Sequence, residues 1–203
     1  MSRGILITFE GGEGAGKSTQ IKFAASYFRK KARKVLVVRE PGSTPIGEQI
    51  RNILLHPKNK KMAVETELFL YVAARAQLVK EVIEPALKKG IVVISDRYED
   101  STIVYQGYAG GLPVDFVGRI AAAARGKIMP RLTFLLDVNV RSGLRRSGRS
   151  DRMEKKPVAF HERIRNGFLS LARKNKKRFV VISTNQSQKE VTQKIKEALD
   201  HAF

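Results

Sequence analysis

The stretch Gly11-Gly12-Glu13-Gly14-Ala15-Gly16-Lys17-Ser18 matches G-x-x-x-x-G-K-[ST], the pattern of a phosphate-binding P-loop. Its glycines let the backbone curl so that successive N–H groups point at phosphate oxygens. The lysine supplies a compact positive charge for the β- and γ-phosphates, and the hydroxyl of the serine can reach Mg²⁺. The pattern therefore predicts that the chain binds a nucleoside triphosphate.

The flanking residues provide the strand, loop and helix that this motif requires. Residues 5–9 are a short apolar run typical of a buried strand, and residues 18–31 predict a helix with one apolar face. The N-terminal dipole of such a helix favours a phosphate. A glycine-rich turn without a ligand is the alternative, but a turn has no need of Lys-Ser here. The expected ATP-binding segment comprises Gly11, Gly12, Glu13, Gly14, Ala15, Gly16, Lys17, Ser18 and Thr19.

Four further apolar runs alternate with helical patterns along the chain. They span residues 35–38, 91–94, 132–136 and 179–182. Continuous apolar runs are typical of strands covered on both faces, and helices between them give parallel strands with right-handed crossovers. The sequence therefore predicts an α/β protein of the P-loop NTPase fold, with a five-stranded parallel sheet and helices on both faces. Without an internal repeat or linker, residues 1–203 are expected to form a single domain.

The composition excludes several classes of protein. The chain has no cysteine, which excludes disulfides, thiol catalysis and cysteine-based zinc sites. No apolar run approaches 18 residues, so no membrane span is expected. The N-terminus also lacks the apolar core of a signal peptide. We therefore expect a cytoplasmic protein with no membrane partner.

The net charge of +20 is unusual for an enzyme that acts on small molecules. Residues 141–178 alone hold fourteen Lys or Arg against three acidic residues. Such a charge suits nucleic acid, a membrane surface or anionic substrates, or it is a solvated surface. Aromatic residues are not interleaved with the basic run, apart from phenylalanines that fit core positions. A P-loop ATPase that binds nucleic acid is therefore the weaker alternative, and nucleic acid is not expected as a partner.

Charged residues follow the predicted strands at the edge of the sheet where ligands bind. Asp96 ends the third strand, where P-loop enzymes place the carboxylate that binds Mg²⁺ directly or through water. Arg97 beside it suits a phosphate. Asp137 ends the fourth strand and competes for the Mg²⁺ role, but Asn139 and a predicted helix follow it. We therefore favour a turn or cap role for Asp137 and expect Ser18 and Asp96 at the metal.

Two further segments have residues that suit a nucleotide. Tyr71 and Arg75 lie four residues apart on a long predicted helix, 65–87, so they share a face and could stack on and hydrogen-bond a base. On spacing alone a packed tyrosine and a snorkelling arginine are favoured. Residues 141–153 are rich in arginine, with two glycines and three serines. They predict a flexible lid that closes over phosphates, although a basic loop or a nucleic-acid contact is possible.

Taken together, these motifs resemble the thymidylate kinase family. The matching stretches are Phe9–Thr19, Arg39–Thr44 (Arg-Glu-Pro-Gly-Ser-Thr), Tyr71–Gln77 (Tyr-Val-Ala-Ala-Arg-Ala-Gln), Asp96–Gly107, which runs from Asp-Arg-Tyr to Tyr-Gln-Gly, and Asp151–Glu154 (Asp-Arg-Met-Glu). The resemblance implies transfer of the γ-phosphoryl group of ATP to dTMP with Mg²⁺. Another nucleoside monophosphate kinase is the alternative within this class.

The resemblance also implies roles for individual residues. Glu13 would lie near the sugar 3′-hydroxyl and the water shell of the metal, while Arg51 and Arg97 would hold the acceptor phosphate. Tyr71 would stack on the base, and Arg75 would hydrogen-bond its O4. Thr102 and Gln106 would line the base and its N3 edge. Tyr105 would pack under the deoxyribose. The implied residues are, for catalysis, Lys17, Arg97, Arg149 and Arg152, and, for dTMP, Glu13, Arg51, Tyr71, Arg75, Arg97, Thr102, Tyr105 and Gln106.

The chain departs from parts of the family pattern. The P-loop has Ala15 where some members have an arginine, so the lid must supply the catalytic charge. Arg149 and Arg152 are the expected catalytic arginines of the lid, and Arg145 and Arg146 are the second choice. Tyr71 replaces the usual phenylalanine. Members are typically homodimers through helix packing, and helix 65–87 is more apolar than a one-sided surface helix requires, so we expect a homodimer.

Overall fold

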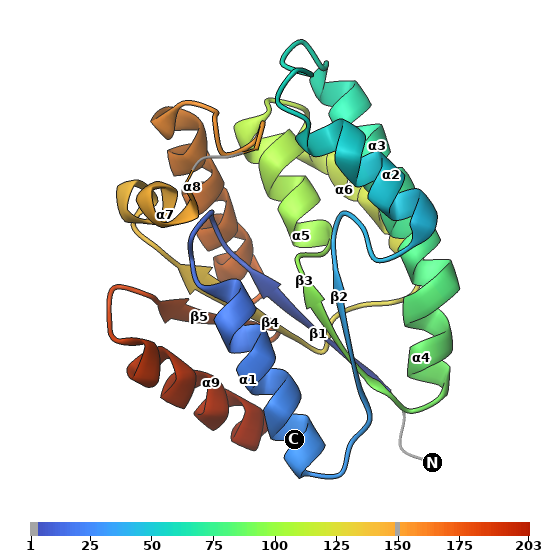
Figure 1. Cartoon of the computed structure of the whole chain (residues 1–203), viewed down its shortest axis with the longest axis vertical. Coiled ribbons are helices and arrows are strands. Elements are labelled where there is room, and N and C mark those ends of the chain that lie inside the picture. Colours follow the sequence, from blue (N-terminus) through green and yellow to red (C-terminus); the bar gives the residue numbers. More distant parts are fainter. Residues whose placement is uncertain (1–3, 149–150) are drawn as a thin grey trace.

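A five-stranded parallel sheet forms the centre of the computed structural model, which describes residues 4–148 and 151–203 (Figure 1). The strands lie in the order β2 (Val35–Arg39), β3 (Val92–Asp96), β1 (Ile5–Glu10), β4 (Leu132–Asp137), β5 (Phe179–Ser183). Every neighbouring pair is parallel. The predicted strands and the five-stranded parallel sheet are thereby confirmed.

Helices cover both faces of the sheet because alternate residues of each strand face opposite sides. On one face, α1 (Lys17–Lys30) and α9 (Gln188–Ala202) pack beside one another (Figure 1). They bury Ile7, Phe9 and Phe134. The opposite face of the sheet packs against α3 (Val64–Leu78), α4 (Glu84–Lys88) and α8 (Val158–Lys174). Residues from both faces thus form an apolar core around the central strand.

The long helix predicted at 65–87 is interrupted. It runs as α3, then a π-helical turn, η1 (Val79–Ile83), then α4. Pro85 lies in the first turn of α4 and has no N–H to donate to the carbonyl of Glu81, so the regular helical pattern cannot pass through it. A second π-helical segment, η2 (Ile103–Ala109), follows the four-residue helix α5 (Glu99–Thr102). The remaining helices are α2 (Pro45–Leu55), α6 (Val114–Arg125) and α7 (Val140–Ser147).

The order of the strands locates the ligand site. From β1 the chain passes to β2, at one edge of the sheet. Later it passes from β3 to β4, toward the opposite edge, so the connections diverge beside β1. In such sheets ligands bind beyond the carboxyl ends of the strands at this point. Phe9 pairs with Asp96, and Asp96 pairs with Arg39, so the loops that follow these strands meet at one edge.

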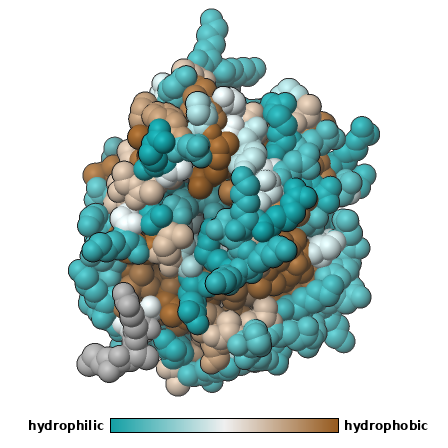
Figure 2. Space-filling view, turned by 180° about the vertical axis from the view of Figure 1, so that it is seen from behind, coloured by the Kyte–Doolittle hydropathy of each residue, from teal (hydrophilic) through white to brown (hydrophobic). Residues whose placement is uncertain are grey.

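The face turned away in Figure 1 is largely hydrophilic, with smaller hydrophobic patches (Figure 2). Within the described part of the chain, no helix has the length and apolar character needed to cross a membrane.

Candidate active site

The P-loop connects β1 to α1 with three glycines at positive φ, Gly11, Gly14 and Gly16, at 136°, 65° and 86°. A Cβ on Gly11 would lie 2.4 Å from the carbonyl oxygen of Leu136, so the loop also needs glycine there to pass close to β4. The Nζ of Lys17 donates to the carbonyl oxygens of Gly11 and Gly12, at 3.3 and 3.1 Å. Burial and the neighbouring charge of Arg97 lower the pKa of Lys17, while nearby carboxylates oppose the shift.

A cleft of about 550 Å³ opens beyond the carboxyl ends of the strands, and most of the expected site residues line it. The P-loop forms one end, and side chains from α2, α3, α5 and η2 form the other. From the expected set, the structure brings together Glu13, Gly14, Ala15, Gly16, Lys17, Ser18, Thr19, Arg51, Tyr71, Arg75, Asp96, Arg97, Thr102, Tyr105 and Gln106.

Arg97 lies between the two ends of the cleft in a left-handed backbone conformation, with φ 69°. Its Nη1 donates to the carbonyl oxygen of Gly11 at 3.0 Å and to Oγ of Ser101 at 3.1 Å. Its Nη2 donates to Oε1 of Glu13 at 3.0 Å. Burial alone would raise the pKa of Glu13, but the charges of Arg97 and Lys17 outweigh it and lower that pKa to about 2. Glu13 and Arg97 thus form a charged pair next to the P-loop.

A second charged pair closes the far end of the cleft. Nε of Arg75 donates to Oε2 of Glu40 at 2.8 Å, and its Nη2 donates to Oγ1 of Thr102 at 2.9 Å. Burial raises the pKa of Glu40, and the Arg75 charge opposes that rise. The Nη1 of Arg75 is buried without a hydrogen-bond partner among the described residues, and so is the Oε1 of Gln106. These unpaired polar atoms suit a ligand that has both an acceptor and a donor.

The residues expected at the metal also fit it. Asp96 ends β3, and its Oδ1 is buried with no hydrogen-bond partner within residues 4–148 and 151–203. Ser18, at the start of α1, is exposed and lines the same cleft. A carboxylate and a hydroxyl are oxygen ligands of the kind Mg²⁺ takes when it also binds substrate phosphates. No cluster of three or more His, Asp or Glu is found in the described residues. Mg²⁺ in nucleotide sites needs only one or two carboxylates, because water and substrate phosphates complete its coordination.

Much of the predicted lid is helical. Its first half is the helix α7, on which Arg146 is exposed and lines the cleft, while Arg145 is exposed without lining it. Arg149 lies outside the described residues. Arg152 does not reach the cleft: its Nε donates to the carbonyl oxygen of Leu54 at 2.7 Å, and its Nη2 lies 2.6 Å from Oε2 of Glu67. The structure therefore places Arg146, rather than Arg152, at the cleft.

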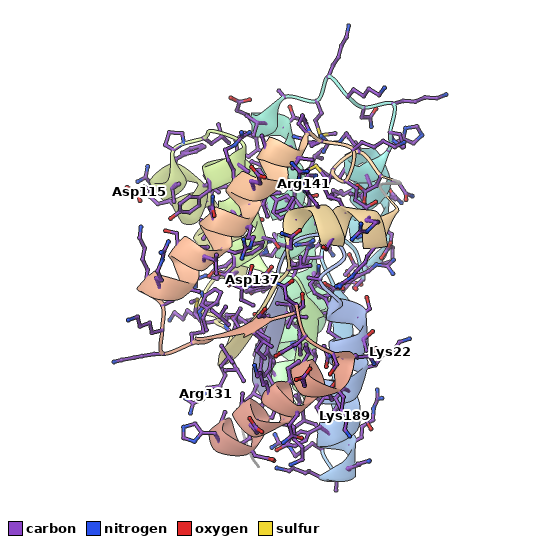
Figure 3. All side chains as sticks on the ribbon, turned by 90° about the vertical axis from the view of Figure 1, so that its left-hand side faces the viewer. Lys22, Asp115, Arg131, Asp137, Arg141 and Lys189 are labelled. Atoms are coloured by element: carbon purple, nitrogen blue, oxygen red, sulfur yellow. The ribbon has the colours of Figure 1, made fainter. Side chains whose placement is uncertain are left out.

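Asp137 forms an ion pair instead of the helix cap expected for it. Its two carboxylate oxygens accept from Nε and Nη2 of Arg165, at 2.6 and 2.8 Å, and Asn139 caps α7 instead. Figure 3 shows Asp137 at the end of β4, with Arg141 on α7 beyond it. Lys22, Arg131 and Lys189, labelled in the same view, are exposed on the outer surface, as expected of a solvated basic surface.

Three buried acidic side chains at or next to the cleft were not predicted as site residues from the sequence: Glu10, Glu40 and Glu67. Glu10 ends β1 and accepts from the backbone N–H of Tyr98 at 2.8 Å and from Oγ of Ser101 at 2.6 Å. Glu67 precedes Tyr71 and Arg75 at intervals of four, which puts the three on one helical face. This spacing was a usable signal, whereas the positions of Glu10 and Glu40 depend on contacts far apart in sequence.

A triphosphate-binding loop that shares one cleft with an arginine-lined acceptor pocket defines the class of P-loop kinases acting on small phosphorylated substrates. The family model "Thymidylate kinase" matches residues 9–195. A curated thymidylate kinase of Geobacter sulfurreducens is 50% identical over 191 residues, which cover 90% of each chain. One of Symbiobacterium thermophilum is 44% identical over 98% of this chain and 94% of its own. The crystal structure of thymidylate kinase from Ehrlichia chaffeensis superposes with a TM-score of 0.80 at 32% identity, covering 98% and 99% of the two chains. The chain belongs to the thymidylate kinase family.

Proposed function

We propose that this chain transfers the γ-phosphoryl group of ATP to dTMP, giving ADP and dTDP. The family match and the relatives support this reaction. The observation that carries it is the position of Arg97, which contacts both Gly11 of the P-loop and Glu13. A phosphate held by Arg97 would lie next to a triphosphate held by the loop. Such transfer depends on positioning and on neutralising charge more than on covalent chemistry by the protein.

The acceptor would lie along the wall formed by α2, α3 and η2. Arg51 donates to the carbonyl oxygen of Pro41 and lines the cleft, so it can hold the acceptor phosphate together with Arg97. Tyr71 would stack on the thymine, and Arg75, Thr102 and Gln106 would meet its polar edge. Tyr105, whose hydroxyl donates to Oε1 of Glu13 at 2.6 Å, would pack under the deoxyribose.

Mg²⁺ would bind between Ser18, Asp96 and the phosphates. The unpaired Oδ1 of Asp96 supports this assignment. Mg²⁺ would neutralise the charge on the β- and γ-phosphates. The nucleophile is a phosphate oxygen that is already ionised near neutral pH, so no protein base is needed.

Arg146 would supply the charge that the P-loop lacks at Ala15, and Arg149 stays a second candidate. Arg152 would act from outside the cleft by fixing the segment after α7 to Glu67. A conformation that brought Arg152 to the phosphates would first have to break this buried ion pair.

We further propose a homodimer in the cytoplasm. Large apolar side chains are exposed on two neighbouring helices, with Ile46 and Ile53 on α2 at 50% and 48% and Phe69 on α3 at 53%. A second copy packed on these helices would remove them from water. The basic surface is proposed to be solvated rather than bound to nucleic acid.

The proposed reaction is tested by ADP formation from ATP and Mg²⁺ with dTMP, dUMP, dCMP and AMP as acceptors. We expect the highest kcat/KM with dTMP. A higher value with dCMP or AMP would support the other monophosphate kinases. ATP turnover stimulated by DNA or RNA, with affinity that falls steeply as salt rises, would instead support a nucleic-acid-binding ATPase.

A further inference from the structure

A carboxylate behind the base end of the cleft connects three separate segments. Glu67 on α3 is 1% exposed and does not line the cleft. Its Oε1 accepts from Nε2 of Gln106, on η2, at 2.7 Å. Its Oε2 lies 2.6 Å from Nη2 of Arg152 and 3.9 Å from Nζ of Lys156. Glu67 is therefore held from one side by cations while its other oxygen contacts a residue of the cleft.

This contact determines which way the amide of Gln106 faces. A carboxylate oxygen accepts hydrogen bonds, so Gln106 has to turn its NH₂ group toward Glu67. The amide oxygen leaves the same carbon in a different direction. Oε1 of Gln106 is buried and has no hydrogen-bond partner in the described part of the chain, and Gln106 lines the cleft. Gln106 therefore offers the ligand an acceptor, and leaving this acceptor unpaired is costly.

Arg75 completes the pattern on the same wall. Its Nε and Nη2 are occupied by Glu40 and Thr102, whereas its buried Nη1 has no partner among the described residues. On α3 and η2 the wall thus offers one free donor and one free acceptor, and Oε1 of Glu40, the ion-pair partner of Arg75, is also unpaired among the described residues. Thymine has an acceptor at O4 and a donor at N3, which match both. Cytosine has a donor at N4 and an acceptor at N3, which match neither.

We propose that Glu67 is a specificity-determining positioning residue: by holding Nε2 of Gln106, it keeps Oε1 as the acceptor for the imide N–H of the base. Without the carboxylate, the amide can turn over and donate to a base that has an acceptor there. Glu67 touches no substrate and acts through Gln106. This inference rests on the proposed phosphorylation of dTMP.

The test compares kcat/KM for dTMP and dCMP in the full chain. Glu67→Gln is expected to lower the ratio of dTMP to dCMP by roughly tenfold to a hundredfold, the range for one misplaced buried hydrogen bond. Glu65→Gln is the matched control, because Glu65 is an exposed residue of the same helix. Its ratio should equal that of the wild type. If Glu67→Gln lowers both values in equal proportion, Glu67 is only structural and the proposal is overturned.

A double-mutant cycle tests whether Glu67 acts through Gln106. In a Gln106→Ala background, adding Glu67→Gln should leave the dTMP to dCMP ratio unchanged. A further fall in that background would overturn the proposal.

If Glu67→Gln does not fold because Arg152 is left as an unpaired buried charge, Arg152→Met is compared with Glu67→Gln/Arg152→Met. The lower ratio is then expected in the double variant alone, and equal ratios would overturn the proposal. A wild-type chain that does not prefer dTMP would contradict the proposed function itself.

Discussion

The hydroxyl of Tyr105 donates to Oε1 of Glu13 at 2.6 Å, and the same oxygen accepts from Nη2 of Arg97 at 3.0 Å. The guanidinium of Arg97 also lies over the ring of Tyr105, 5.1 Å from its centroid. These contacts join η2, the P-loop and the end of β3. Each of the three side chains is therefore fixed by the other two, at the place where the proposed donor and acceptor phosphates meet.

Replacing Tyr105 with Phe should impair this arrangement while keeping the ring. The hydroxyl of Tyr105 helps to lower the pKa of Glu13, so the pKa should rise from about 2 in the variant. A lost hydrogen bond to a buried charged group costs about 1.5–3 kcal/mol, and we expect kcat/KM for dTMP to fall roughly tenfold to a hundredfold. The acid limb of the pH–rate profile should move to higher pH.

Tyr108→Phe is the control for this variant. Its hydroxyl lies on the same π-helical segment but contacts Ser170 at 3.4 Å, outside the cleft. Its kinetics should match those of the wild type. Unchanged kcat/KM in Tyr105→Phe would show that the hydroxyl does not hold Glu13 in the working enzyme.

Glu10 should make stability depend on pH. Burial and the negative charge of Asp100 raise the pKa of Glu10 from 4.5 to about 8, although Arg97, Ser101 and Tyr98 oppose the rise. The folded chain therefore holds this proton more firmly than the unfolded chain. The contribution is fully present below pH 4.5 and is lost as the pH rises toward 8.

Glu10→Gln removes the ionisation but keeps the shape of the side chain. Between pH 5 and pH 8, the free energy of unfolding of the wild type should fall relative to that of the variant, by a few kcal/mol at about 1.4 kcal/mol per pH unit. Urea denaturation at both pH values measures the difference. Glu65→Gln, at an exposed site, should follow the wild type. Parallel pH dependences of Glu10→Gln and the wild type would mean that Glu10 is ionised throughout.

The sheet and the ligand loops were predictable because their signals are local. The apolar runs mark the strands, and the P-loop pattern places Lys17 and Ser18 at the start of α1. The position of Arg152 was not predictable, because it depends on Glu67, 85 residues earlier in the chain. The cluster of arginines suggested one lid surface, yet the structure turns Arg146 toward the cleft and Arg152 toward the core. Interruption of the long helix by η1 was likewise hidden in a continuous apolar pattern.

Substitution of Arg146 is expected to lower kcat, whereas substitution of Arg152 is expected to lower stability. Arg146→Ala should lower kcat roughly a hundredfold to a thousandfold with the melting temperature unchanged, because an exposed charge beside the phosphates is lost. Arg152→Ala should lower stability by about 3–5 kcal/mol, because the buried charge of Glu67 loses the nearer of its two cations and keeps only Lys156, at 3.9 Å. Kinetics and thermal unfolding of both variants separate the effects.

Arg145→Ala is the control, since Arg145 is exposed on α7 but does not line the cleft. It should keep the wild-type kcat and melting temperature. If Arg152→Ala melted like the wild type and lost only kcat, Arg152 would be the lid arginine that acts on the phosphates, and the ion pair with Glu67 would contribute little to stability.

Phe69 is the most exposed large apolar side chain on α3, and the proposed dimer gives it a partner. Apolar side chains at the centre of an interface contribute 2 kcal/mol or more to association, so Phe69→Asp should weaken dimerisation by about thirtyfold or more. Sedimentation velocity at micromolar concentration should show a dimer for the wild type and a monomer for the variant. Met129→Asp is the control, because Met129 is 46% exposed and belongs to the loop before β4 rather than to α2 or α3. A monomeric wild type would rule out the dimer, and a dimeric Phe69→Asp would place the interface elsewhere on the surface.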